Sequence, residues 1–424
     1  MVLSLLLVAF YGIIWRVGPA DGKHTRTKID LLSAKKTATN QVYKKFLNKK
    51  EIQTAIDGKN FINRIDKSFD LVLDGRYCRV ETSLDIGLQN FILKNMQRST
   101  SRYIGIVAME PSTGKVLLMA GFDKINPSSN PCIQSKFPAA SIFKIVTASA
   151  AIEKCNFNSN STLTYNGNKY TLYKSQLKNR TNKYTNRITL RDSFAQSVNP
   201  VFGKIGSLYL GKSNLYKYAT AFGFNRNIDF EIPLSPSHLS LSDEPYQWAE
   251  IASGFNRETV ISPLHGALLG STILNRGKLV EPTIIEKISD ETGHILYESR
   301  LKTINHAIDD RTSKVVKNLM NATIRSGTCR KYFRKYRQDP ILSKLNIGGK
   351  TGSISNKAHN IRYDWFVGFA EEKKGPQKIA LSIIVGHEKY IGKRATQYAR
   401  MAIKEYFRDY FAKKTRIIEL NSSR

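Results

Sequence analysis

Three short motifs follow one another along this chain, and their order constrains the fold more than any other feature of the sequence. They are Ser141-Ile142-Phe143-Lys144, Ser197-Val198-Asn199 and Lys350-Thr351-Gly352-Ser353. Each motif is weak when taken alone, because Ser-x-x-Lys also starts at four other serines, although Lys-Thr-Gly occurs once. The context of each motif therefore decides whether the three belong to one site.

The residues around the first motif predict that its serine begins a helix. Pro138-Ala139-Ala140 leads into Ser141, and apolar residues then recur at helical spacing from Ile142 to Ile152. Lys144 would stand one turn beyond Ser141 on the same helix face. This arrangement places an amine beside a hydroxyl group.

The second motif falls at a predicted junction between two helices. Thr189-Leu190-Arg191-Asp192 has the pattern of a capping box and opens the first helix. That helix ends near Ser197, and Pro200 can occupy the first turn of the next one. Ser197 and Asn199 would then lie in a turn from which their side chains can reach a cleft.

Strand patterns occur early and late in the chain, with helices between them. Five apolar runs predict strands, namely Tyr103–Met109, Lys115–Ala120, Ile347–Ser353, Asp364–Ala370 and Lys378–Val385. The first two runs are joined by a turn at residues 111–114, and a helical stripe from Ala395 to Tyr410 would cover one face of the sheet. We therefore expect one α/β domain whose sheet is closed by both ends of the chain.

The three motifs supply the parts of a nucleophilic site. A serine hydroxyl is a poor nucleophile until a base removes its proton. Lys144 can be that base for Ser141 if its amine is neutral, and burial and a nearby cation, Lys350, both favour the neutral form. Ser197 would relay a proton to a leaving amine, and Asn199 would orient the substrate amide.

Backbone groups complete the predicted site. The N–H of Ser141 is free at a helix start, and with the N–H of Ser353 it would form an oxyanion hole, a feature worth about 10²–10³ in rate per donor. Gly352 would let a substrate peptide lie against the strand edge, as in β-strand addition. The hydroxyls of Thr351 and Ser353 are candidates to hold a terminal carboxylate.

Structural alternatives exist for each motif. Ser141 alone would be an ordinary helix N-cap, and Ser197 and Asn199 would be ordinary turn residues. Gly349-Lys350-Thr351 has the form of the end of a phosphate-binding loop, but Lys344 stands where that loop requires its first glycine. Phosphate binding by this motif is therefore disfavoured.

The wider sequence resembles the transpeptidase domain of high-molecular-mass penicillin-binding proteins over roughly residues 75–410. Beside the three motifs, the segments that carry the likeness are Thr82-Ser83-Leu84-Asp85 with Leu88-Gln89, Met109–Val116, Phe137–Ser141, Ser262-Pro263-Leu264-His265, Asn275-Arg276-Gly277, Ser326-Gly327-Thr328 and Trp365–Phe369. The resemblance implies an α/β (α+β) fold with a five-stranded antiparallel sheet flanked by helices and a helical lobe. Because these matches occur in the same order as in the family, they outweigh the structural alternatives given above for each single motif.

The resemblance implies a serine D,D-transpeptidase that cross-links peptidoglycan stem peptides through an acyl-enzyme and is inhibited by β-lactams, without a cofactor. We expect a monofunctional, class B-like member. A D,D-carboxypeptidase or a β-lactam-binding sensor would use the same site. A β-lactamase is disfavoured because no Glu-x-x-Leu-Asn motif follows the nucleophile. The intact motif set also argues against a non-catalytic basic binding protein, which labelling by a fluorescent penicillin would exclude.

Composition narrows the set of partners. The formal net charge is +32, which suits polyanions or an anionic membrane but also fits a compositional drift toward lysine. The densest basic cluster is Arg330–Arg337, whose interleaved aromatics resemble those of single-strand binders, although a solvated face is the simpler interpretation and we expect no nucleic acid. The four cysteines and seven histidines show no metal-binding spacing, so we expect no metal, and no disulfide is inferred.

The chain divides into four predicted regions. Residues 1–20 contain the apolar run Val2–Trp15 and would be an uncleaved membrane anchor or signal segment, residues 21–74 a basic linker, 75–412 the transpeptidase domain and 413–424 a basic tail. The positive flank after the run opposes export. We nevertheless expect a protein of the cytoplasmic membrane with its catalytic domain on the extracytoplasmic, periplasmic side. Other cell-wall synthesis proteins are further candidate partners.

Overall fold

The central sheet forms from the five apolar runs. In the computed structural model, which describes residues 46–56 and 61–422, five antiparallel strands have the order β13-β14-β15-β3-β4. Their bounds are β3 Ser101–Met109, β4 Val116–Asp123, β13 Leu345–Ser355, β14 Arg362–Glu372 and β15 Lys378–His387. Segments more than two hundred residues apart meet where β15 pairs with β3, with Ile383 opposite Ile106. The fold is the mixed α/β fold with a five-stranded antiparallel sheet that the resemblance implied.

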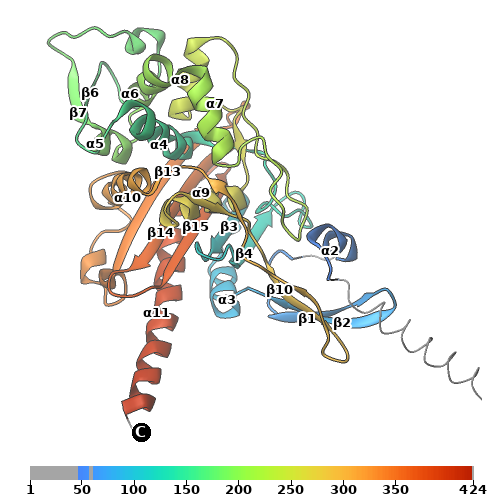
Figure 1. Cartoon of the computed structure of the whole chain (residues 1–424). Helices are drawn as coiled ribbons and strands as arrows, with labels where there is room; N and C mark the ends of the chain where they lie inside the picture. Colours follow the sequence, from blue (N-terminus) through green and yellow to red (C-terminus); the bar gives the residue numbers. More distant parts are fainter. Residues whose placement is uncertain (1–45, 57–60, 423–424) are drawn as a thin grey trace, which may run out of the picture. The chain divides into compact units, whose positions relative to one another are not determined.

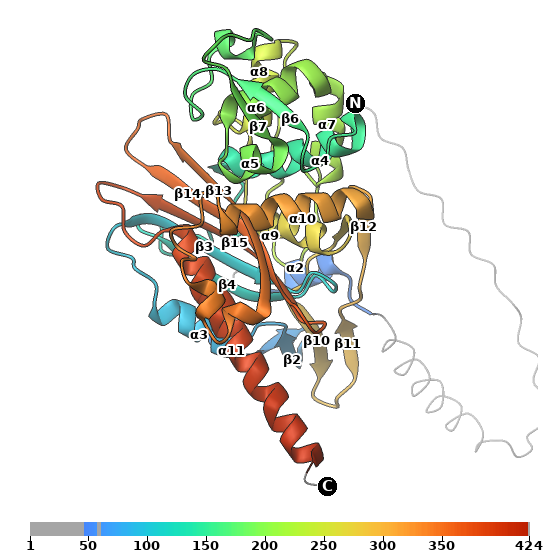
Figure 2. The ribbon, with the colours of Figure 1, turned by 90° about the vertical axis from the view of Figure 1, so that its left-hand side faces the viewer.

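Helices cover both faces of the sheet, which explains why its strands are apolar throughout (Figures 1 and 2). On one face lie α9 (Pro263–Leu274), buried along its whole length, and α10 (Asp310–Arg325). On the other lie α3 (Ile86–Lys94) and α11 (Ala395–Ser422). Along β14, Trp365 and Val367 face α9 and α10, while Phe366 faces α11, as the period of two in a strand requires.

A helical lobe forms between the early and late strands of the sheet. Its elements are α4 (Lys144–Cys155), β6 (Thr162–Tyr165), β7 (Asn186–Thr189), α5 (Leu190–Ala195), α6 (Asn199–Lys204), a π-helical turn Ile205–Leu210, α7 (Gly211–Ala221) and α8 (Pro245–Ser253). Thr189 caps α5 by accepting a hydrogen bond from the N–H of Asp192, as its sequence pattern predicts. The lobe and the sheet share one apolar core.

A second, four-stranded sheet has the order β1-β2-β10-β11. Its strands are β1 (Ser68–Leu73), β2 (Arg76–Thr82), β10 (Ile285–Asp290) and β11 (Ile295–Glu298). The predicted boundary between linker and domain at residue 74 falls in the turn between β1 and β2, and the compact unit begins at Leu47. Two-stranded ladders join β5 (Phe137–Pro138) to β8 (Val260–Ile261) and β9 (Lys278–Val280) to β12 (Thr303–His306).

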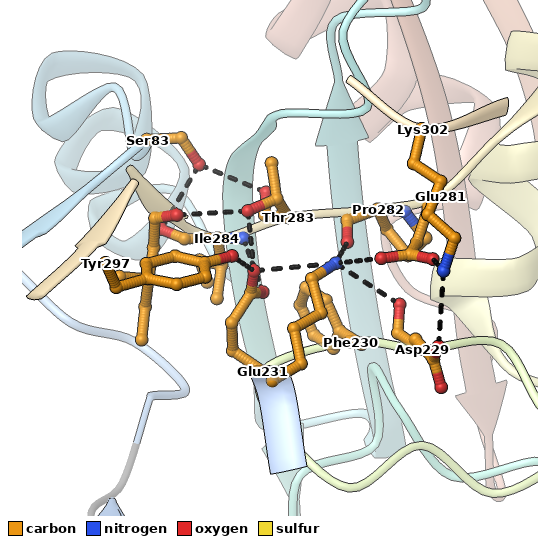
Figure 3. Close-up of polar contacts among 12 residues, drawn as sticks. Ser83, Asp229, Phe230, Glu231, Glu281, Pro282, Thr283, Ile284, Tyr297 and Lys302 are labelled. Atoms are coloured by element: carbon orange, nitrogen blue, oxygen red, sulfur yellow. Dashed lines mark hydrogen bonds and ion pairs between the residues drawn. The ribbon is translucent and has the colours of Figure 1, made fainter. Parts of the chain in front are cut away.

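A buried polar network connects helix α2 (Lys49–Ala55) to the second sheet (Figure 3). The carboxylate of Glu231 is fully buried and accepts hydrogen bonds from Thr283 Oγ1 (2.6 Å), the N–H of Ile284 (3.0 Å) and Tyr297 Oη (2.9 Å). Lys49 Nζ lies 3.6 Å from this carboxylate and 2.7 Å from that of Glu281. The amine of Lys49 thus lies beside two carboxylates that folding removes from water.

Replacing Lys49 by methionine should destabilise the domain. Losing one partner of a buried ion pair leaves an uncompensated charge, which costs about 3–5 kcal/mol. We expect a loss of about 3 kcal/mol in the free energy of unfolding, because Lys302 still pairs with Glu281. Lys50→Met is the matched control, since Lys50 is the neighbouring exposed lysine of α2. Urea unfolding of both variants checks this, and equal stability would contradict it.

The structure describes most of the predicted C-terminal tail and none of the predicted N-terminal anchor. The predicted anchor, residues 1–20, lies outside the described residues. No helix among the described residues is long and apolar enough to span a bilayer. The predicted tail, residues 413–424, continues α11 as far as Ser422, and the helix projects beyond the sheet in both views (Figures 1 and 2).

Candidate active site

Ser141 lies in a 3₁₀ turn, Ala140–Phe143, that leads directly into α4. The approach to this turn is held on two sides. Trp365 Nε1–H donates to the carbonyl of Pro138 (2.9 Å), and the N–H of Ala139 donates to the carbonyl of Thr259 (2.8 Å). Ala140 adopts a left-handed conformation with φ 48°, which is strained for a residue with a Cβ. The backbone that presents Ser141 is therefore fixed by its surroundings.

The amine of Lys144 is fully buried and has three oxygen neighbours. Its Nζ lies 2.8 Å from Ser141 Oγ and 2.8 Å from Asn199 Oδ1, and it also donates to the carbonyl of Ser253. A neutral amine has two N–H bonds and one lone pair. The two carbonyl oxygens can only accept, so they take both N–H bonds and leave the lone pair for the hydroxyl hydrogen of Ser141.

The electrostatic surroundings favour this neutral form. Burial, with a smaller contribution from the charge of Lys350, holds the pKa of Lys144 well below its ordinary value of 10.5. Burial also lowers the pKa of Lys350, to about 7. An unperturbed lysine at pH 7 would be neutral in only about one molecule in three thousand, so the shift decides whether Lys144 can act as a base.

The pH dependence of acylation should reveal this shift. The base is active without its proton, so a lowered pKa moves the rise in acylation rate to lower pH, and we expect its midpoint well below 10.5. Lys350→Ala should move the midpoint upward, because one cation near Lys144 is lost. Acylation rates of a chromogenic β-lactam across the pH range test both statements, and a wild-type midpoint near 10.5 would contradict them.

Ser197 and Lys350 form the second half of the site. Ser197 lies between α5 and α6 in a left-handed conformation, φ 59°, and its Oγ accepts a hydrogen bond from Lys350 Nζ at 2.9 Å. Lys350 also donates to the carbonyl of Thr351 (2.9 Å) and is fully buried in β13. Of the two predicted catalytic lysines, Lys144 thus contacts the serine of the first motif, and Lys350 contacts the serine of the second.

Asn199 joins the lobe to the lysine of the first motif. It is the first residue of α6, its Oδ1 receives a hydrogen bond from Lys144, and its Nδ2 donates to the carbonyl of Tyr170 (2.9 Å). Its own N–H donates to the carbonyl of Lys169 (2.7 Å). The side chain is therefore held in one orientation at the edge of the cleft.

The third motif lies on β13, the edge strand of the central sheet. Gly352 packs beside Ser141, because a Cβ at this position would lie 3.3 Å from the N of Ser141. The hydroxyl of Thr351 lies 2.6 Å from that of Thr328, and Ser353 Oγ accepts from Arg362 Nε (3.0 Å). The backbones of Ser141 and the third motif thus adjoin, and the paired N–H groups of Ser141 and Ser353 stay a prediction.

These residues line one cleft of about 730 Å³. Ser141, Ser197, Asn199, Thr351, Gly352 and Ser353 all border it. Arg257, Lys331, Arg362 and Arg394 bring positive charge to its walls, while Arg394 is paired with Asp364 (3.4 Å). The cleft therefore suits a ligand that carries a carboxylate.

Two neighbours of Ser141 were not predicted from the sequence. The carbonyl of Ser253, at the end of α8, accepts from Lys144. Gly254 follows in a left-handed conformation, and a Cβ there would lie 1.9 Å from the carbonyl oxygen of Ala140. A backbone acceptor carries no side-chain signal, so no motif marks either residue. Thr328 was noted only within the segment Ser326-Gly327-Thr328.

Where the structure describes them, the other serines that start Ser-x-x-Lys do not border this cleft. Ser112 lies in the turn between β3 and β4, which the N–H of Gly114 closes by donating to Glu110 (3.0 Å). Ser175 lies in the exposed 3₁₀ turn Lys174–Leu177, Ser299 follows β11, and Ser33 falls outside the described residues. Among the described matches, only Ser141 adjoins the other two motifs.

Comparison with known proteins agrees with this arrangement. Residues 104–404 match the family described as the penicillin-binding protein transpeptidase domain. Stage V sporulation protein D of Bacillus subtilis is 23% identical over 313 residues, which are 69% of this chain and 47% of that protein. Penicillin-binding protein PbpB of Mycolicibacterium smegmatis is 24% identical over 330 residues, 67% of this chain and 46% of that protein. The chain thus spans about half the length of these relatives.

Solved structures share the fold. The D,D-transpeptidase domain of a peptidoglycan glycosyltransferase from Eggerthella lenta superimposes with a TM-score of 0.64 at 22% identity, covering 78% of this chain and 83% of that one. Penicillin-binding protein A of M. tuberculosis, solved as an imipenem acyl-enzyme complex, has a TM-score of 0.63 at 18% identity, covering 77% and 79%.

The family match covers well over half of the chain and contains all three motifs that meet in the cleft. It also contains four strands of the central sheet and two thirds of the fifth, β3. Fold and sequence therefore lead to one conclusion, that this chain belongs to the family of penicillin-binding protein transpeptidase domains.

Proposed function

We propose that the protein is a serine D,D-transpeptidase that cross-links peptidoglycan stem peptides and is acylated by β-lactams. The observation that carries this proposal is the position of Lys144 Nζ, 2.8 Å from Ser141 Oγ with its other neighbours both carbonyl oxygens. The hydroxyls of Ser141 and Ser197 border one cleft, and each contacts a buried amine, that of Lys144 or Lys350. Acyl transfer through a serine ester requires a nucleophile that a base can activate, and the lowered pKa of Lys144 suits that role.

The proposed reaction begins with proton transfer from Ser141 to Lys144. Oγ then attacks the carbonyl carbon of the penultimate D-alanine, and the N–H groups of Ser141 and Ser353 hold the oxyanion. As the C–N bond breaks, Ser197 passes a proton to the leaving nitrogen, and free D-alanine departs. The amine of a second stem peptide next attacks the ester carbonyl and gives its proton to Ser197. The C–O bond of the ester then breaks, the new amide is released, and Lys144 returns the hydroxyl hydrogen to Ser141.

The walls of the cleft fit the two ends of such a donor peptide. β13 is an edge strand, so it can pair with an extended peptide along its free side. At the end of the third motif, Arg362 is bonded to Ser353 and Arg257 Nε donates to the carbonyl of Ser355 (2.8 Å). These cations would bind the terminal carboxylate of the donor together with the hydroxyls of Thr351 and Ser353.

The names of relatives support the same activity. One relative is named peptidoglycan D,D-transpeptidase PbpA, from Mycolicibacterium smegmatis, and it is 22% identical over 322 residues, 66% of this chain and 61% of that protein. Structures of the M. tuberculosis penicillin-binding protein A are described as acyl-enzyme complexes with penicillin G and imipenem. We propose the same β-lactam chemistry for this chain.

A peptide assay tests the proposal. The full chain is incubated with a synthetic stem peptide that ends in D-alanyl-D-alanine, with and without an amine acceptor, and the products are analysed by mass spectrometry. We expect release of D-alanine together with a coupled peptide when the acceptor is present. Release without coupling would indicate a carboxypeptidase, and no release would contradict an enzyme of either kind.

We also propose that the catalytic domain works outside the cytoplasmic membrane, since its proposed substrate lies there. A β-lactamase reporter fused after Arg424 should be active in the export assay, and deletion of Val2–Trp15 should abolish this activity, because that run is the apolar segment able to direct export. A reporter that is active only in the cytoplasm would contradict cross-linking as the function of this chain.

A further inference from the structure

A basic surface of the domain takes no part in the proposed reaction. Five exposed cations, Arg325, Arg330, Arg334, Lys335 and Arg337, surround a hollow of about 230 Å³, which we call the basic hollow. No aspartate or glutamate occurs from residue 325 to residue 338. Within the described part of the chain, none of the five cations forms an ion pair. The positive charge of the hollow is therefore uncompensated.

The segment that carries these cations is held in place by contacts with the central sheet and α11. Phe333 is buried and stacks on Phe366 of the central sheet, with ring centroids 6.4 Å apart. From α11, Arg400 Nη1 donates to the carbonyls of Tyr332 (2.8 Å) and Arg334 (3.2 Å). These contacts hold like charges together, and their mutual repulsion is a cost that a bound anion would offset.

The types of the side chains indicate which anion would bind. Four of the five cations are arginines, whose planar guanidinium groups donate two parallel hydrogen bonds to phosphate or carboxylate oxygens. Several guanidinium groups around one hollow match a group with several charged oxygens better than a single carboxylate does. The volume of the hollow is below the ~300–1,000 Å³ of pockets for drug-sized ligands, so it would hold the charged group and leave the rest of the molecule outside.

The basic hollow lies next to the substrate cleft. Lys331 and Tyr332 line the cleft, while the adjoining residues Arg330 and Phe333 line the hollow. One rigid turn of the chain therefore separates the two. A ligand held in the hollow would lie beside the proposed donor site without entering it.

From these observations we infer that the basic hollow is a binding site for the phosphoryl groups of an anionic ligand, such as a pyrophosphate or phosphodiester. The inference does not depend on the proposed reaction, because none of its residues belongs to the catalytic set. The phosphoryl group can come from a soluble molecule or from a lipid headgroup, and the experiment distinguishes these two sources.

The test compares two double variants of the full chain that lose the same charge. Arg334→Gln with Arg337→Gln removes two cations of the hollow. Arg180→Gln with Arg187→Gln removes two exposed arginines from the lobe, neither of which the structure describes in an ion pair or lining the basic hollow. Binding of inorganic pyrophosphate is measured by calorimetry, and binding of phosphatidylglycerol vesicles by sedimentation, both at ~0.1 M salt.

The hollow variant should bind pyrophosphate at least about tenfold more weakly than the wild type, which corresponds to about 1.4 kcal/mol. The lobe variant should bind it within about twofold of the wild type. If only vesicle binding shows this difference, the site takes a lipid headgroup. Equal losses in both variants, no binding of either probe, or tighter hollow-dependent binding of a single-stranded oligonucleotide would overturn the inference. Both variants should unfold at the wild-type urea concentration, which shows that they are folded without relying on the proposed reaction.

Discussion

Ser141→Ala should abolish covalent labelling by a β-lactam while the domain remains folded. The hydroxyl oxygen is the atom that would form the ester, and the amine 2.8 Å from it, Lys144 Nζ, belongs to a fully buried side chain. The substitution removes one small group from a partly exposed turn, so folding should change little. Fluorescent penicillin on a denaturing gel measures the label, and urea unfolding measures the fold.

Ser175→Ala is the matched control, because Ser175 begins another Ser-x-x-Lys sequence on the same lobe. It should label at the wild-type rate. Labelling of Ser141→Ala at the wild-type rate would show that the nucleophile lies elsewhere. Loss of labelling together with loss of the fold would leave the substitution uninterpretable, so Ser141→Cys, which keeps a nucleophile in place, should be examined beside it for slow labelling.

Lys144→Ala should slow acylation by about 10²–10⁴-fold, the usual contribution of a general base, and should weaken the initial binding of the β-lactam far less. The reason is that, in the proposed reaction, Lys144 takes the proton of Ser141 in the acylation step and makes no contact that binds the β-lactam beforehand. The variant also removes the Lys144 donor from Asn199 Oδ1 and from the Ser253 carbonyl, which keeps Ser141 Oγ at 3.5 Å. Stopped-flow acylation at several β-lactam concentrations separates the binding and acylation steps.

Lys154→Ala provides the comparison on the same helix, since Lys154 lies exposed in the last turn of α4. It should have no effect on either step. If Lys144→Ala instead left the acylation rate unchanged, another group would have to be the base. Lys350, whose pKa of about 7 also permits a neutral amine, would then be the next candidate.

The central sheet could be predicted from the sequence because its strands are marked by strong local patterns. β13, β14 and β15 are long apolar runs with a clear breaker at Gly375-Pro376, and each lies within two residues of its expected bounds. The second sheet could not be predicted in the same way. β1 pairs with β2, and β2 pairs with β10, so that Val80 lies opposite Ile288. A pairing across two hundred residues leaves no local signal, so the sequence could not show that the strands on both sides of residue 74 belong to one sheet.

In the site too, the features marked by local sequence were predicted, and the contacts that depend on distant segments were not. The residues of the three motifs were expected to meet, and they do meet in one cleft. The carbonyl of Ser253 and the tight contact at Gly254 were not expected, because they depend on where α8 ends relative to Ala140. The burial of Lys144 and Lys350, which lowers their pKa values, also depends on packing from distant segments. Sequence identified the chemical groups, and tertiary structure sets their protonation.

The position of the acyl adduct tests the central claim most directly. The full chain is treated with penicillin G, digested, and each peptide is sequenced by mass spectrometry. We predict one adduct with the added mass of the intact penicillin, on Ser141 and on no other residue, formed at neutral pH without a metal or cofactor. An adduct on Ser112, Ser175, Ser197 or any other residue, or no adduct on a protein that is demonstrably folded, would contradict the account.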